Sequence, residues 1–187
     1  MLKVLGNKKG GATTMWLMLL PAFLMIGLFF GSMFMVKMSH SSAEVAADAG
    51  SIAATKKLDE WILPKLPLPA QGPVTIPGAT DRLGNEKIQE MLSKVDQQLL
   101  ANLADQILKQ KEQEMVEAVR YYVQKNGGDA HGKIIYPVEG GRIEVRARVK
   151  YRPPIFQDFF QDTYIQGSGM GPKREFLKLL PKREITF

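Results

Sequence analysis

The longest apolar segment of the chain lies near its start and runs from Ala12 to Val36 without a charged side chain. A hydrocarbon core about 30 Å thick needs roughly 20 apolar residues in helical form, so this segment is long enough to cross a bilayer with some tilt. Inside lipid, each backbone N–H and C=O group must find its partner within the segment, which requires a helix. The pattern therefore predicts a transmembrane helix over residues 12–36.

Small side chains extend the helical pattern beyond the apolar segment. Alanine is the strongest helix former, and no proline occurs between Pro21 and Pro64. We therefore expect one continuous helix from about Ala12 to about Trp61, roughly 75 Å long at about 1.5 Å per residue. Its outer half carries small residues at intervals of four, namely Ser39, Ala43, Ala47 and Ser51. This half is either a smooth packing surface or merely a stalk.

Two glycines within the apolar segment, Gly27 and Gly31, form a GxxxG spacing. Glycines one helical turn apart leave a groove in which the backbone of another helix can approach closely. Together with Ala43, Ala47 and Ser51, they define a small-residue surface on the long helix. We expect this surface to pack laterally against helices of other subunits.

The pattern changes abruptly after Trp61. Closely spaced prolines disfavour both helix and strand, so residues 64–84 are expected to form an extended linker. An amphipathic stripe then predicts a second helix that begins near Asn85, a favourable N-cap, and ends before Gly127. The polar run around Gln110 leaves two alternatives, one long rod or a bend at that point.

The C-terminal part switches to the period of two that is typical of strands. Residues 133–138 and 142–151 flank residues 139–141, which predicts a hairpin with one face toward the second helix. Residues 182–187 are a candidate third strand, because a hairpin alone is only marginally stable in water. The glycine-rich segment 167–171 lacks the lysine and the spacing of a phosphate-binding loop, so we expect a flexible surface loop there.

These elements predict an α+β fold. It comprises a long N-terminal transmembrane helix that continues outside the membrane, a second amphipathic helix and a small antiparallel β-sheet. The chain is expected to divide into a cytoplasmic basic segment (1–11), the transmembrane helix (12–36), an extracytoplasmic helix extension (37–63), a proline-rich linker (64–84) and an exported α+β domain (85–187).

Charge sets the expected orientation in the membrane. The net charge is +6, and Lys3, Lys8 and Lys9 precede the apolar segment, whereas the first acidic residue is Glu44. Because basic flanks stay on the cytoplasmic side, we expect the N-terminus inside and the rest of the chain outside. A cleaved secretory signal is the alternative, although the apolar core of such a signal is usually only about 7–15 residues long.

The composition offers few groups for catalysis. The absence of Cys excludes a disulfide scaffold, a Cys-ligated zinc site and a thiol nucleophile, and only His40 and His131 are available for histidine chemistry. No metalloprotease, calcium-loop or nucleophile-elbow motif occurs. We therefore expect no enzyme activity, no cofactor and no metal site. The basic strand face around Arg146 is interrupted by Glu144, so we expect a solvated face and not a nucleic-acid site.

Three segments carry a family resemblance: Gly11–Thr14 before an apolar span with Pro21, the alanine-rich run 46–54, and the strand 145–154 that ends in two prolines. In these segments the chain resembles the TadE/TadG-like proteins, pilin-like components of bacterial tight-adherence (Flp-type) pili. The resemblance implies a structural or accessory pilin-like subunit in tight-adherence (Flp/type IV-like) pilus assembly, anchored once in the bacterial inner membrane. Its implied partners are the membrane and other pilin-like or pilus-assembly subunits.

Gly10 and Gly11 form a candidate processing site for a prepilin peptidase. Cleavage after Gly11 would place Trp16 at the fifth position, where TadE-like proteins and Flp pilins carry Glu. A carboxylate there can neutralise the new N-terminal amine of a neighbouring subunit, whereas Trp cannot. This departure resembles the TadG-type members, which stay anchored as accessory proteins. The alternatives are a membrane-tethered extracytoplasmic binding module and a secreted protein with a cleaved signal.

Overall fold

The computed structural model describes residues 11–65, 86, 90, 92–93, 95–153 and 157–187. Its elements are α1 (Gly11–Ile62), η1 (Leu63–Lys65), α3 (Gln97–Gln110), α4 (Glu112–Lys125), β1 (Lys133–Val138), β2 (Arg142–Lys150), η2 (Gln157–Phe160), β3 (Tyr164–Met170), η3 (Glu175–Leu179) and β4 (Arg183–Thr186). A long N-terminal apolar helix, two further helices and a four-stranded antiparallel sheet confirm the expected α+β class.

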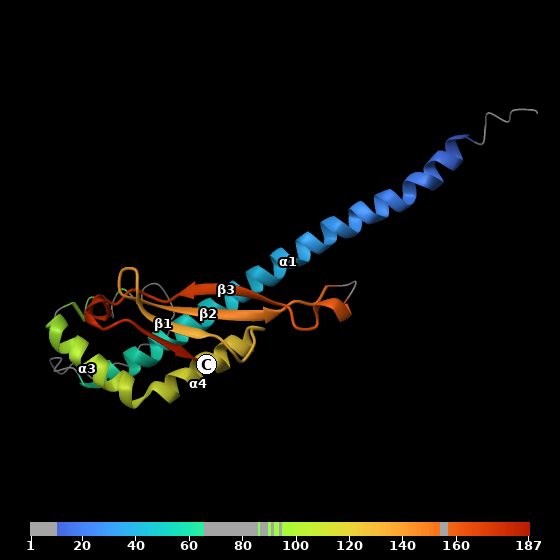
Figure 1. The fold of residues 1–187 in the computed structure, drawn as a ribbon. Helices are drawn as coiled ribbons and strands as arrows, with labels where there is room; N and C mark the ends of the chain where they lie inside the picture. Colours follow the sequence, from blue (N-terminus) through green and yellow to red (C-terminus); the bar gives the residue numbers. More distant parts are fainter. Residues whose placement is uncertain (1–10, 66–85, 87–89, 91, 94, 154–156) are drawn as a thin grey trace, which may run out of the picture.

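Helix α1 is unbroken over 52 residues, includes Pro21, and agrees with the expected helix over residues 12–61. Figure 1 shows its N-terminal half projecting alone and its C-terminal half packed against the rest of the chain. The side chains of Met15–Phe34 are exposed, whereas Ala43 and many of the small residues after it are buried. Within the part of the chain that the structure describes, α1 is the one helix long and apolar enough to cross a membrane.

The expected second helix is interrupted at two points. Asp96 caps α3, because its carboxylate accepts a hydrogen bond of 2.9 Å from the backbone N–H two residues later. Lys111 separates α3 from α4, which confirms a bend near Gln110 and excludes one straight rod. The expected N-cap Asn85 and residues 66–84 of the expected linker lie outside the described residues.

The sheet has the strand order β3-β2-β1-β4, with every neighbouring pair antiparallel. The hairpin between β1 and β2 forms as expected, and Gly140 and Gly141 supply the positive φ angles of 74° and 77° in its turn. Strand β4 confirms the expected third strand within residues 182–187. Ile143, Val145 and Ala147 of β2 are buried on the inner face, as the alternation predicts.

Strand β3 corrects the expectation for the glycine-rich segment 167–171. Gly167–Met170 is not a flexible surface loop but the second half of a strand that pairs along β2. Glycine is disfavoured in strands, because it has no side chain to pack and loses the most backbone entropy on folding. The ladder with β2 and the close approach of α1 outweigh that cost here.

The core lies between the inner face of the sheet, the C-terminal half of α1, and helices α3 and α4. Each of these elements contributes fully buried side chains, including Leu58 from α1, Leu100 from α3, Val119 from α4, Ile134 from β1 and Val145 from β2. The C-terminal half of α1 is therefore part of the same folded unit as the sheet.

Candidate functional site

The small residues of α1 pack directly on the glycines of β3. A Cβ atom built at Gly167 would lie 2.5 Å from the carbonyl carbon of Ala43, and one at Gly169 would lie 2.5 Å from Oδ1 of Asp48. Gly171, just after the strand, also lies against this helix, at Ser51 and Thr55. Real Cβ atoms essentially never come this close to other heavy atoms, so positions 167 and 169 of β3 admit only glycine without rearrangement.

The helix and the strand fit together because their repeats have nearly equal lengths. Four residues of α-helix advance about 6.0 Å, and two residues of strand advance about 6.6 Å. The small residues therefore pair in order: Ala43 with Gly167, Ala47 with Gly169 and Ser51 with Gly171. As a result α1 and β3 run side by side in the same direction (Figure 1).

This contact gives an unexpected partner to three of the residues predicted to pack against other subunits. Ala43, Ala47 and Ser51 have no exposed surface, because β3 of the same chain covers them. Residues 43–51 are thus a packing surface and not a bare stalk, but a helix of another subunit has no access to their small-residue face. The glycines of β3 were missed from the sequence, although their spacing of two matches the helical spacing of four.

The groove at Gly27 and Gly31 is open. A Cβ atom at either position would meet nothing within 4 Å, and the surrounding side chains of α1 are exposed. This groove is the part of the predicted surface that is available to another helix. Of the candidate processing residues, Gly11 begins α1 and Gly10 lies outside the described residues, while Trp16 is 68% exposed.

A buried ion pair fastens the C-terminal end of α1 to the segment after β3. Nε of Arg174 donates to Oδ1 of Asp59 at 2.9 Å, and Nη2 of Arg174 donates to Oδ2 at 2.5 Å. The two side chains are 1% and 8% exposed. Burial raises the pKa of Asp59 above its ordinary value, and the guanidinium opposes that rise. No motif in the sequence signals this pair, because 115 positions separate its members.

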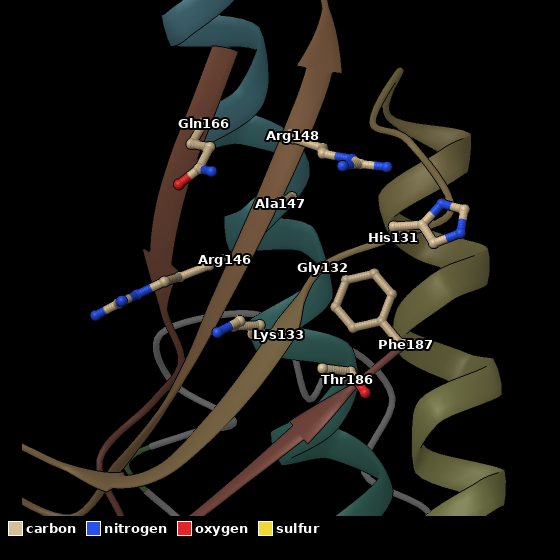
Figure 2. Close-up of a pocket in the computed structure, with 9 residues that line it drawn as sticks. All are labelled: His131, Gly132, Lys133, Arg146, Ala147, Arg148, Gln166, Thr186 and Phe187. Atoms are coloured by element: carbon tan, nitrogen blue, oxygen red, sulfur yellow. The ribbon is translucent and has the colours of Figure 1, made fainter. Parts of the chain in front are cut away.

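The outer face of the sheet carries a hollow of about 360 Å³ beside Phe187. Figure 2 shows Lys133, Arg146 and Arg148 extending from the strands around it. Each of these cations already has a carboxylate partner: Lys133 with Glu184 at 2.6 Å, Arg146 with Glu144 at 2.7 Å, and Arg148 with Asp129 at 2.7 Å. The charges around the hollow are therefore compensated within the chain.

Asp129 illustrates how firmly these charges are paired. Partial burial raises the pKa of Asp129, but hydrogen bonds from Nε of Arg148 and from the backbone N–H of Ala130 outweigh that effect. The pKa of Asp129 therefore lies below its ordinary value. The guanidinium of Arg148 also lies 4.3 Å from the ring centroid of Tyr164, so its position is fixed from two sides.

Comparison with known proteins bears on the N-terminal part of the chain. No curated protein and no solved structure gives a significant match. Residues 10–57 match the family model described as putative Flp pilus-assembly TadE/G-like. This segment contains both the apolar half of α1 and the small residues that pack on β3, and the match supports involvement in Flp pilus assembly. The resemblance of the chain to the TadE/TadG-like family is thereby confirmed over residues 10–57.

Proposed function

We propose that the chain is a non-enzymatic, pilin-like structural or accessory subunit in Flp (tight-adherence) pilus assembly. In this proposal α1 spans the bacterial inner membrane once, with the N-terminus in the cytoplasm and the folded domain outside. The family match supports the pilus context. The basic flank of Lys3, Lys8 and Lys9 supports the orientation, because such flanks are retained on the cytoplasmic side.

The observation that carries the proposal is the division of α1 between two environments. Met15–Phe34 is exposed and almost wholly apolar, whereas the helix from Ala43 onward is buried against the sheet of the same chain. Those exposed residues form about 30 Å of helix, which equals the thickness of a bilayer core. Apolar surface of this extent is unfavourable in water and favourable in lipid.

The same division limits where the subunit can meet other helices. The small-residue face of α1 outside the membrane is occupied by β3, whereas the groove at Gly27 and Gly31 is open. We therefore assign lateral packing to the groove inside the bilayer, where small residues let helix backbones approach closely.

The test is the substitution Gly31→Ile in the full-length protein in cells. Isoleucine fills the groove, and it touches nothing in the fold of this chain because the site is open. We expect a loss of crosslinks within the membrane between α1 and helices of other pilus-assembly subunits, together with fewer pili under the electron microscope. Met33→Ile is the matched control, since Met33 is exposed on nearly the opposite face of the helix.

Equal crosslinking in both variants and in the unaltered protein would contradict packing through the groove. The membrane anchor has its own test in the intact mass of the mature protein. Retention of Met1, or loss of residues 1–11 alone, agrees with the proposal. A mature chain that starts near Glu44 would contradict it and would favour a secreted protein.

A further inference from the structure

The connection between β2 and β3 lies at the end of the domain that faces the apolar half of α1. Its described residues are 151–153 and 157–163, and they include η2. Figure 1 shows η2 at the end of the sheet nearest the projecting helix. This end of the domain is therefore the one nearest the membrane if α1 spans the bilayer.

The pairing of α1 with β3 gives the level of this connection relative to the membrane. Gly167 lies against Ala43, and Tyr164 begins β3 three residues earlier. Three strand residues advance about 10 Å, which equals about seven residues of α-helix. Tyr164 therefore lies level with about Val36, the last residue of the apolar segment.

The burial of α1 supports this level. Among the described side chains of Met15–Met38, Met35 is half-buried and the others are exposed. Met35 and the half-buried Ser39 continue the row of Ala43 and Ala47 by two helical turns. The folded domain therefore covers one side of α1 as far as Met35, one residue before the apolar segment ends at Val36.

The C-terminal end of α4 stays farther from the membrane. Gly127, just after α4, lies beside Ser42, since a Cβ atom built there would be 3.8 Å from Oγ of Ser42. Ser42 is six residues beyond Val36, or about 9 Å along the helix. The headgroup layer on one side of a bilayer is only about 5–8 Å thick, so this end lies outside it.

The side chains of the connection suit a headgroup layer. Phe160 is 38% exposed, and its ring packs edge-to-face on that of Tyr151 at a centroid distance of 5.5 Å. Lys150 and Arg152, the chain neighbours of Tyr151, are exposed. Aromatic rings with one apolar and one wet edge, and long cationic side chains that reach phosphates, are typical of membrane interfaces.

We propose that the described residues 150–153 and 157–164 form a membrane foot that rests in the outer headgroup layer, with Phe160 toward the acyl chains and Lys150 and Arg152 at lipid phosphates. This inference rests on the proposed function in one respect, since it needs α1 to span the bilayer up to Val36. Two exposed acids, Asp158 and Asp162, equal the two cations in number, so the foot carries no net charge. The foot therefore depends on α1 to hold it at high effective concentration beside the lipid.

The chain contains no cysteine, so single nitroxide labels can test the foot in the full-length protein. Gln161→Cys labels the foot, Phe29→Cys labels the span, and Leu179→Cys labels an exposed site in η3, next to the turn between β1 and β2. In vesicles of phosphatidylcholine and phosphatidylglycerol, spin relaxation measures collisions with lipid-soluble oxygen and with a water-soluble nickel chelate. We expect the oxygen-to-nickel ratio at position 161 to lie between the high ratio at 29 and the low ratio at 179.

The three labels test the membrane foot and the transmembrane span of α1 separately. A low oxygen-to-nickel ratio at position 161, as expected in water, together with a high ratio at position 29, as expected in lipid, overturns the foot and leaves the span intact. Low oxygen-to-nickel ratios at both positions overturn the span, and with it the proposed function. Shielding of position 161 from both reagents indicates a protein contact and also overturns the foot.

The charge of the foot has a separate test. Lys150→Gln and Arg152→Gln are each expected to lower the ratio of docked to undocked foot about fivefold in vesicles with phosphatidylglycerol, because one cation near an anionic surface contributes about that factor. In these two variants the nitroxide at position 161 should become more accessible to the nickel chelate. Lys178→Gln, on η3, is the matched control and should cause no shift. Equal label positions in all three variants would overturn the assignment of the two cations to lipid phosphates.

Discussion

At the scale of single residues, the glycines of β3 decide how closely α1 approaches the sheet. A Cβ atom at Gly169 would overlap the backbone of α1 at Ala47 and Asp48, so Gly169→Val must push α1 outward or distort β3. Overpacking of this kind costs about 1–3 kcal/mol in free energy of unfolding. We expect the thermal midpoint of the full-length protein in detergent to fall by about 3 °C or more, as followed by near-UV circular dichroism.

The neighbouring residue supplies the control for this substitution. Ser168 is exposed and points to the opposite face of β3, because side chains alternate along a strand. Valine is a better strand former than serine, so Ser168→Val should leave the midpoint unchanged or raise it. Equal losses at Ser168 and Gly169 would show that strand composition, and not contact with α1, controls the stability.

The buried pair of Asp59 and Arg174 makes a second prediction at this scale. Asp59→Leu and Arg174→Met each remove one member of a buried ion pair and leave the charge of the other uncompensated by its counter-ion, which typically costs about 3–5 kcal/mol. The double variant removes both charges and keeps apolar volume, so it should recover most of the loss. A double-mutant cycle on thermal midpoints measures the coupling. Additive losses would contradict a direct interaction between the two side chains.

At the scale of elements, α1 serves both the membrane and the domain. A chain of residues 38–187 keeps Ala43–Ile62, so we expect it to fold and to unfold cooperatively on heating. A chain of residues 64–187 lacks the helix on which β3 packs, and its sheet would expose its inner face. We expect it to lose that cooperative transition and the dispersed amide signals of a folded protein. A folded 64–187 chain would restore the interpretation of the outer helix as a stalk.

The elements that the sequence predicts are those whose signals are local. The apolar run 12–36 and the alanines after it are sufficient to predict α1, and alternation with a Gly140-Gly141 turn is sufficient for the β1–β2 hairpin. The open groove at Gly27 and Gly31 follows from spacing alone, because its surroundings are the same helix.

The elements that could not be predicted depend on partners far along the chain. Strand β3 is rich in glycine, which disfavours strands, and the helix that makes glycine necessary lies about 120 residues earlier. The pairing of Asp59 with Arg174 likewise depends on the path of the chain in space. The break at Lys111 was one of two alternatives, since a polar run fits both a solvated helical turn and a bend.

At the scale of the whole molecule, the proposal requires one orientation, with the basic N-terminus in the cytoplasm and the domain outside. Asn7→Cys and Leu179→Cys place single thiols on either side of the span in a chain without other cysteines. In intact spheroplasts we expect a membrane-impermeant maleimide to label position 179 but not position 7, and to label both after permeabilisation. The three lysines before the span should cause this bias, so replacing Lys8 and Lys9 by Gln should give a mixed population. Labelling at position 7 alone in intact spheroplasts would put the folded domain in the cytoplasm, where it could not contact an external pilus.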